Sequence, residues 1–169
     1  MIISLIGYMG SGKSHISKVL SQKINFKLID LDRQISVKNK MTIPEIFEKR
    51  GEIYFRKQEN QILNKILGST KDIILSVGGG TPAYFNNMEI INKHSESVFL
   101  QSSVKMLSER ILKQKEKRPL VANIADEDLP EFIAKHLFER NVFYSQAKYK
   151  VITDGKSPEE IADEIAALF

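Results

Sequence analysis

A phosphate-binding loop lies almost at the N-terminus of the chain and limits the folds open to it. Residues 7–14 read GYMGSGKS, which matches every fixed position of the pattern G-x-x-x-x-G-K-[ST]. The apolar run 1–6 before the loop predicts a buried strand, and the stretch 13–24 after it has apolar residues at helical spacing. Strand, glycine loop and helix form the context in which this motif holds phosphates. The sequence therefore predicts a nucleoside triphosphate site.

Each part of the loop has a physical role in this interpretation. Around Gly10, Ser11 and Gly12, successive backbone N–H groups can turn inward around phosphate oxygens, at the positive end of the following helix. Lys13 can reach the β- and γ-phosphates, and Ser14 can offer its hydroxyl to Mg²⁺. The other interpretation is a glycine-rich turn that carries Lys-Ser by chance, which a full match in the right context disfavours.

Length and composition are those of one soluble globular domain. The chain has 169 residues, of which 42% are hydrophobic and 27% charged. It has no cysteine, and its three histidines lack metal-ligand spacing, so a zinc site is not expected. The first apolar run is too short for a signal peptide, and none approaches the roughly 20 residues of a membrane span. A net charge of +4 is too small to indicate nucleic acid as a partner. We expect a cytoplasmic protein with no membrane partner.

Strands and helices alternate along the rest of the chain. Further strands are predicted at 26–30, 73–77, 97–100 and 150–153. Helices are predicted at 43–67, 86–92, 103–113, 128–146 and from 158 onward. Pro44 suits a helix start, Gly51 is expected to break the long helical region, and Ser157 to Glu160 read as a capping box. This alternation predicts an α/β fold, with a mostly parallel sheet covered by helices on both faces.

Two of the predicted strands end in residues suited to a ligand site. Asp30 ends the second strand and Asp32 lies two positions further on; in extended backbone both would point to the same side, where they could support Mg²⁺ through water and orient a hydroxyl. The alternative is a helix N-cap, since a helix could start near Arg33. The residues alone leave these two open. Gly78–Gly80 follow the third strand, either as a loose turn or as backbone that a ligand approaches closely.

Cationic residues provide the remaining candidates. The segment 113–126 is highly charged and poor in apolar residues, so it is either a solvated loop or a mobile lid that carries cations over the triphosphate. The kinase context favours the lid. Arg56, Arg118 and Arg140 are candidates for binding carboxylate or phosphate in a bidentate fork. Composition alone does not separate them from the other arginines.

Together the motifs resemble the shikimate kinase family from the first strand to the final helix. After the phosphate loop they are Asp30-x-Asp32, Phe55-Arg56-x-x-Glu59, Gly78-Gly79-Gly80, Arg118-Pro119-Leu120 and Arg140-x-x-x-Tyr144. The resemblance implies a single P-loop kinase domain over 1–169, with a lid near 113–126 and a five-stranded parallel sheet like that of nucleoside monophosphate kinases. It also implies a monomer that moves the γ-phosphoryl group of ATP to the 3-hydroxyl of shikimate with Mg²⁺, a step toward chorismate and the aromatic amino acids.

The resemblance implies a role for each site residue as well. Catalytic roles fall to Lys13, Asp32 and Arg118, with Asp32 either a base or an orienter of the hydroxyl. Shikimate is bound by Asp32, Arg56, Gly78, Gly79, Gly80 and Arg140. The nucleotide is bound by Gly10, Ser11, Gly12, Lys13, Ser14, His15, Arg110, Arg118, Lys156 and Pro158. Mg²⁺ is bound by Ser14 and by Asp30, the latter through water.

Two other functions are open to a chain with this loop. One is another small-molecule kinase, gluconate-type or acting on nucleoside monophosphates; a nucleotide acceptor would need a base-sized pocket, whereas Arg56 with Arg140 suits a compact acid. The other is a P-loop switch protein. Many P-loop ATPases place an aspartate at the end of the third strand, where this chain has Leu75-Ser76, and no guanine-recognition motif is evident.

Overall fold

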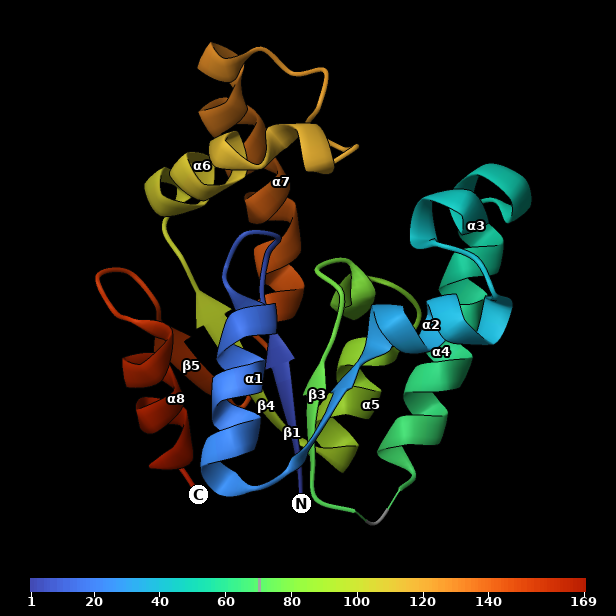
Figure 1. Cartoon of the computed structure of the whole chain (residues 1–169), viewed down its shortest axis with the longest axis vertical. Coiled ribbons are helices and arrows are strands. Elements are labelled where there is room, and N and C mark those ends of the chain that lie inside the picture. Colours follow the sequence, from blue (N-terminus) through green and yellow to red (C-terminus); the bar gives the residue numbers. More distant parts are fainter. Residues whose placement is uncertain (70) are drawn as a thin grey trace.

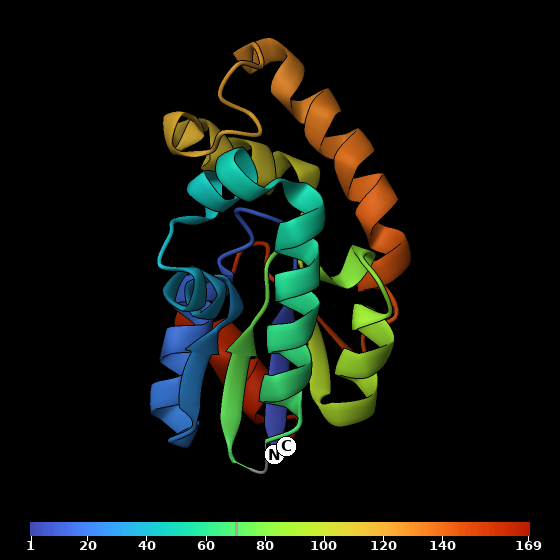
Figure 2. The same ribbon diagram turned by 90° about the vertical axis from the view of Figure 1, so that its right-hand side faces the viewer.

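A five-stranded, entirely parallel sheet forms the centre of the computed structural model, which describes residues 1–69 and 71–169 (Figures 1 and 2). The strand order is β2-β3-β1-β4-β5. The strands are β1 (Ile2–Ile6), β2 (Lys27–Asp30), β3 (Ile73–Ser76), β4 (Glu96–Gln101) and β5 (Tyr149–Ile152). Ile3 of β1 lies opposite Ile74 of β3 and Glu96 of β4, which fixes the register at the centre of the sheet. The predicted α/β fold with a parallel sheet is confirmed.

Helices cover both faces of this sheet. They are α1 (Lys13–Ile24), α2 (Leu31–Asn39), α3 (Ile43–Arg50), α4 (Glu52–Leu67), α5 (Asn87–His94), α6 (Val104–Lys113), α7 (Leu129–Tyr144) and α8 (Pro158–Ala166). Short 3-10 turns are η1 (Thr81–Ala83), η2 (Lys115–Lys117) and η3 (Asp126–Asp128). Helices α1 and α8 lie side by side on one face, as Figure 1 shows, while α4, α5 and α7 pack on the other.

The central strand shows why both faces must be covered. All five residues of β1 are buried, and successive side chains point to opposite faces. Ile3 and Leu5 join the apolar cluster of α1 and α8, whereas Ile2 and Ile6 join the cluster of α4, α5, α6 and α7. A nearly continuous apolar run, here interrupted only by the buried Ser4, is typical of a parallel strand buried on both sides. The sequence of β1 thus fits only a sheet lying between two helical layers.

Local signals set several helix ends. Gly51, at φ 85°, separates α3 from α4, as predicted. Thr42 caps α3 in a complete capping box with Glu45, and Ser157 does the same for α8 with Glu160. These caps satisfy backbone N–H groups that the first helical turn leaves unpaired.

The second strand ends differently from the extended geometry considered for its two acids. Helix α2 begins at Leu31, and Asp30 is its N-cap, with a carboxylate oxygen that accepts the Arg33 backbone N–H at 2.9 Å. Asp32 therefore lies within the first turn of a helix, and the extended interpretation is wrong for it. The capping interpretation is confirmed for Asp30.

The phosphate loop follows β1 at the carboxyl edge of the sheet. Because β1 pairs with β3 on one side and β4 on the other, the loop lies where the order of the strands reverses. Ligands of open parallel α/β sheets bind at such a position. No helix in the described parts of the chain is both long and apolar enough to cross a membrane.

Candidate active site

A cavity of about 500 Å³ lies at this edge of the sheet, where the phosphate loop, the start of α2, the end of β3 and the end of α6 meet. Its lining includes eleven of the residues predicted for the site: Gly10, Gly12, Lys13, Ser14, His15, Asp30, Asp32, Gly78, Gly79, Arg110 and Arg118. These residues come from segments more than a hundred positions apart in the sequence. The parallel sheet brings them together because it places the carboxyl ends of its strands at one edge.

The loop backbone has the conformation that its glycines permit. Gly10 and Gly12 have φ of 81° and 89°, in the left-handed region that other residues rarely adopt. Gly12 is also the N-cap residue of α1 and has no side chain to cap it. The first N–H groups of α1 are thereby left available to a phosphate group at the positive end of the helix.

Lys13 is folded back over the start of this loop. Its Nζ donates hydrogen bonds to the carbonyl oxygens of Gly7, at 2.6 Å, and Tyr8, at 3.0 Å. Burial lowers the pKa of Lys13 to about 8, with Arg118 lowering it further and Asp32 opposing the change. At neutral pH the lysine is still mostly charged, so it brings a desolvated cation to the cavity.

Asp32 lies between the loop and the arginine on α4. Burial raises the pKa of its carboxyl to about 6, and the acids Asp30 and Glu59 raise it further, against the cations Lys13 and Arg56. An alanine Cβ at Gly78 would lie 3.1 Å from the Asp32 carboxylate, so a side chain there would crowd this carboxylate and glycine leaves it room. The result is a carboxylate that can exchange a proton near neutral pH beside two cations.

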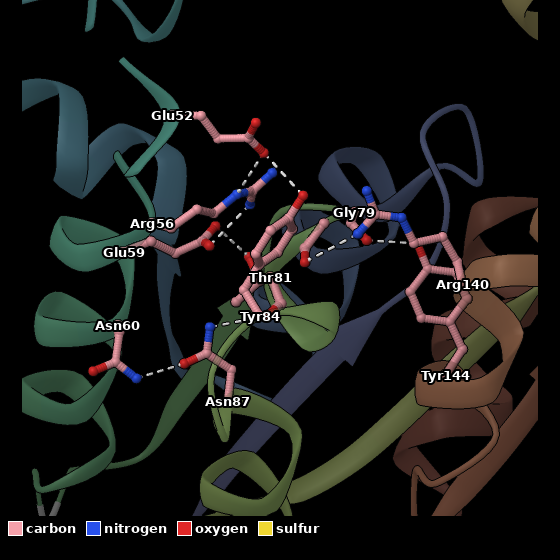
Figure 3. Close-up of polar contacts among 11 residues, drawn as sticks. Glu52, Arg56, Glu59, Asn60, Gly79, Thr81, Tyr84, Asn87, Arg140 and Tyr144 are labelled. Atoms are coloured by element: carbon pink, nitrogen blue, oxygen red, sulfur yellow. Dashed lines mark hydrogen bonds and ion pairs between the residues drawn. The ribbon is translucent and has the colours of Figure 1, made fainter. Parts of the chain in front are cut away.

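Arg56 on α4 and Arg140 on α7 approach Gly80 from opposite sides of Tyr84 (Figure 3). Arg140 Nη1 donates to the Gly80 carbonyl at 3.3 Å, and a Cβ on Gly80 would lie 2.8 Å from Arg56 Nη2. The guanidinium carbon of Arg56 lies 3.8 Å from the centre of the Tyr84 ring, and that of Arg140 lies 5.7 Å from it. Two forked cations therefore face one glycine backbone.

Acidic and hydroxyl groups hold Arg56 in place. Its Nη1 donates to Glu59 Oε1 at 2.9 Å, and the other oxygen of this buried carboxylate accepts from Thr81 Oγ1 at 2.7 Å. Glu52 lies 3.6 Å from Arg56 Nε and accepts from Tyr84 Oη at 2.9 Å. Arg56 Nε is nevertheless buried without a hydrogen-bond partner among the described residues. This N–H is therefore available to an acceptor on a ligand.

The charged segment 113–126 brings Arg118 to the cavity. Arg118 Nη2 donates to Gln114 Oε1 at 3.3 Å, and its Nε is a second buried donor without a partner in the described chain. Lys115 and Asp126 join the two ends of the segment at 2.8 Å. Val121 is fully buried in the core cluster and Ile124 packs against it, so apolar side chains anchor this charged segment.

Some predicted residues lie outside the cavity lining. Arg56, Arg140 and Gly80 form the neighbouring cluster described above, and Ser11 is buried within the loop. Lys156 and Pro158 lie at the start of α8, where Lys156 pairs with Glu164. Arg110 lines the cavity and donates to the Gly10 carbonyl at 3.2 Å, so here it contacts the loop itself.

Several polar residues of the site had no role predicted from the sequence. They are Glu59, Thr81, Tyr84 and Tyr144, of which Tyr144 Oη donates to the Gly79 carbonyl at 2.5 Å. Glu59 and Tyr144 stand in the motifs quoted above, three residues after Arg56 and four residues after Arg140. Residues at this spacing are neighbours on a helix surface, so the sequence could have indicated that each lies beside its arginine. Tyr84 had no comparable local signal.

The residues present fit a magnesium ion that is bound mainly by phosphates. No group of three or more acidic or histidine side chains that could hold a metal exists in the described parts of the chain. Ser14, Asp30 and Asp32 all line the cavity. Mg²⁺ commonly keeps several waters and takes one or two protein ligands beside substrate phosphates, so this donor set is sufficient.

Comparison with known proteins decides the family. The sequence model of the shikimate kinase family matches residues 9–169. A shikimate kinase of Flavobacterium psychrophilum is 46% identical over 164 residues, which cover 96% of this chain and 95% of that protein. The chain belongs to the shikimate kinase family.

Solved shikimate kinases have the same fold. That of Bacteroides thetaiotaomicron has a TM-score of 0.90 and 34% identity, covering 99% of this chain and 96% of the other. That of Acinetobacter baumannii, in complex with shikimate, has a TM-score of 0.88 and 30% identity, covering 99% and 91%. Family membership makes the chain an ATP-dependent, Mg²⁺-using kinase of a hydroxyl acceptor, and neither alternative function is favoured.

Proposed function

We propose that this site transfers the γ-phosphoryl group of ATP to the 3-hydroxyl of shikimate, giving shikimate 3-phosphate and ADP, and that the residues named below carry the reaction. The observation that carries the assignment is the convergence of Arg56 and Arg140 on Gly80, with Asp32 between Arg56 and the phosphate loop. This arrangement of two arginines and one carboxylate suits a small acceptor with a carboxylate at one end and hydroxyls at the other.

The acceptor is bound through its carboxylate and its ring. Arg56 and Arg140 grip the carboxylate, which supplies the acceptor that the buried Nε of Arg56 lacks. The backbone of Gly78–Gly80 lies against the ring, since these glycines leave no side chain between ligand and main chain. A compact acid fits this arrangement, whereas a nucleotide acceptor would need room for a base.

Asp32 acts on the hydroxyl that is phosphorylated. Asp32 interacts electrostatically with both Lys13 and Arg56. It therefore lies between the phosphate loop and the pair Arg56 and Arg140, which we call the acceptor clamp. With a pKa raised to about 6, the carboxylate is ionised at neutral pH and can orient the hydroxyl or accept its proton. Both roles require the ionised form.

Positive charge around the transferred group comes from three sources. Lys13 and the loop amides contact the β- and γ-phosphates, and Arg118 reaches the γ-phosphoryl group from the lid. Ser14, and Asp30 through water, would hold Mg²⁺, which would supply further positive charge to the phosphates. Phosphoryl transfer depends mainly on such alignment and charge.

The remaining site residues bind ATP, and the whole chain forms one domain around them. We assign Gly10, Ser11, Gly12, Ser14 and His15 to the phosphates of ATP, and Arg110, Lys156 and Pro158 to its adenosine. Residues 1–169 form one domain, in which the segment 113–126 closes over the bound nucleotide and keeps water from the phosphoryl group. We propose a cytoplasmic monomer that needs no nucleic acid or membrane partner.

An acceptor panel tests the function directly. ADP release is measured with ATP and Mg²⁺ alone, and then with shikimate, gluconate or a nucleoside monophosphate added. We expect shikimate alone to raise the rate far above the ATP-only background, and Lys13→Ala to abolish that increase. Equal rates with and without shikimate would overturn the assignment, as would a larger response to gluconate or to a nucleotide.

A further inference from the structure

The imidazole of His136 connects the phosphate loop with the acceptor clamp. His136 lies on α7, one helical turn before Arg140. Its Nδ1 lies 2.8 Å from the hydroxyl of Tyr8, inside the loop motif, and its Nε2 accepts a hydrogen bond from Arg140 Nε at 3.3 Å. The ring also packs edge-on against Tyr8, with ring centres 5.3 Å apart, and against Phe132, at 5.7 Å. Both ring nitrogens are thus engaged.

These contacts fix the protonation state of the ring. A guanidinium can only donate, so Nε2 must be the unprotonated nitrogen. A neutral imidazole then carries its proton on Nδ1 and donates it to the Tyr8 oxygen. Burial raises the pKa of Tyr8 well above its ordinary value, so the phenol stays neutral and its oxygen remains an acceptor for that proton.

The two arginines of the clamp are held by different chemistry. Arg56 pairs with Glu59 and Glu52, which neutralise part of its charge. None of the ion pairs among the described residues involves Arg140, whose partners are the Gly80 carbonyl and His136. An uncharged imidazole orients a guanidinium without competing for its charge, which leaves that charge for a ligand's carboxylate.

We propose that His136 is a positioning residue for the acceptor, and that, anchored by Tyr8, it orients Arg140 toward the carboxylate of the substrate. This proposal rests on the proposed function, in which Arg140 grips that carboxylate. The role needs the neutral ring, because a protonated Nε2 would direct N–H against N–H and would place a second cation beside Arg140.

A pH dependence follows from this arrangement. The titratable and charged groups that face the ring are Tyr8 on the phosphate loop and Arg140 and Glu139 on α7. Burial and Arg140 together lower the pKa of His136 below its ordinary value of 6.5, against a smaller opposite effect of Glu139. The neutral form therefore prevails at neutral pH. In acid the contact is lost, so the KM for shikimate rises as the ring is protonated.

Two amide substitutions of His136 test the roles of its Nδ1 and Nε2 one at a time. His136→Gln places an amide oxygen near the position of Nε2, where it can still accept from Arg140. His136→Asn places its amide near the position of Nδ1, where it can still bond to Tyr8 but leaves Arg140 without its acceptor. At pH 8 we expect His136→Asn to raise the KM for shikimate roughly tenfold, with kcat and the KM for ATP within about twofold of the parent. His136→Gln is expected to stay within about threefold in all three.

The pH profiles provide the second measurement. Asp32 also titrates in this range, but it does so in every variant, so the difference between parent and His136→Gln isolates the histidine. We expect the acid rise in the KM for shikimate to be smaller in His136→Gln. His94→Gln changes an exposed histidine at the end of α5 and serves as the matched control. Equal KM values for the Asn and Gln variants, or identical pH profiles for parent and Gln variant, would overturn the proposal.

One further variant separates this proposal from the function on which it rests. Arg140→Ala is expected to raise the KM for shikimate by far more than His136→Asn does. If Arg140→Ala has this effect while His136→Asn has none, the clamp assignment stands and the positioning role is wrong. If Arg140→Ala leaves the KM unchanged, the clamp assignment itself fails.

Discussion

Burial favours the neutral forms of two oppositely charged residues in the site, Lys13 and Asp32. It lowers the pKa of Lys13 to about 8 and raises that of Asp32 to about 6, and each of these residues partly opposes the shift of the other. A buried charge is costly unless it is paired, so these shifts show that the surrounding protein does not fully compensate either group. A bound phosphate can compensate the charge of Lys13, and a bound metal ion or hydroxyl group can compensate that of Asp32.

Arg56→Lys tests the geometry of the clamp as distinct from its charge. Lysine keeps the charge but loses both the planar fork and the two-point contact with a carboxylate. We expect kcat/KM for shikimate to fall roughly thirtyfold, corresponding to about 2 kcal/mol, while the KM for ATP changes little. Steady-state kinetics with each substrate varied in turn measure both, with Arg50→Lys on α3 as the control. A parallel loss in both KM values would indicate a structural effect instead.

Asp32→Asn is expected to stabilise the protein while it disables transfer. The pKa of Asp32 is about 6 in the folded protein, against an ordinary value of 3.8. Between these values the unfolded chain has released a proton that the folded protein retains, so stability falls as pH rises through this window and stays lower above it. The variant should therefore gain about 1 to 2 kcal/mol of unfolding free energy at pH 7.5, since the opening to water reduces the full effect.

Denaturant titration at two pH values checks this sign. The gain in Asp32→Asn should be present at pH 7.5 and smaller at pH 4, where most of the parent's folded-state carboxyl is already protonated. A loss of stability at pH 7.5 would show that Asp32 makes stabilising contacts that outweigh its burial. Undiminished phosphoryl transfer in the same variant would remove Asp32 from the mechanism.

The sequence identified some residues of the site and could not identify others, for a physical reason. Lys13 and Ser14 stand in a local motif whose chemistry depends only on neighbouring backbone, so they could be predicted. Arg56 and Arg140 were selected by family resemblance, because composition does not distinguish one arginine from another. The roles of Tyr84 and His136 arise only when α4 and α7 lie on opposite sides of the turn after β3. No short pattern contains that information.

Among the helices and strands, those with strong local signals were predicted within a few residues. The capping box of α8 and the break at Gly51 are examples, because both depend on neighbouring residues. Helix α2 was considered only as the alternative to an extended acid pair. It buries just Leu31 and Ile35 over nine residues, which is too few apolar positions for a clear helical period. Tertiary packing decides such a segment.

The proposed lid, segment 113–126, gives a testable prediction at the scale of a structural element. It carries Arg118 to the cavity and is anchored by Val121. Arg118→Ala should lower kcat roughly 10²-fold or more, with a smaller effect on either KM, because a cation on the transferring group acts most strongly in the transition state. Single-turnover and steady-state rates measure this, and Lys117→Ala, an exposed neighbour in the same segment, is the control. An unchanged kcat in Arg118→Ala would make the segment an ordinary surface loop.

At the scale of the whole molecule, the parallel sheet places the two halves of the site at the carboxyl edge of its strands. The phosphate loop and residues of the segment 113–126 surround one half, and α4, α7 and the turn after β3 surround the other. Asp32 lies where the two meet, since Lys13 belongs to the first half and Arg56 to the second. Substitutions in one half should therefore leave ligand binding in the other largely intact.

Thermal stability with and without ligands tests this division. A ligand that binds only the folded state at about 100 times its Kd adds about 2.7 kcal/mol, which raises the Tm of a chain of this size by roughly 5 to 10 °C. In the parent protein we expect Mg²⁺ with ADP, and shikimate, each to raise Tm. Arg140→Ala should keep the ADP increment and lose the shikimate increment, whereas Lys13→Ala should lose the ADP increment and keep that of shikimate. If either substitution removed both increments, the two half-sites would have to be one cooperative unit, and the assignment of separate roles to the phosphate loop and the arginine clamp would be wrong.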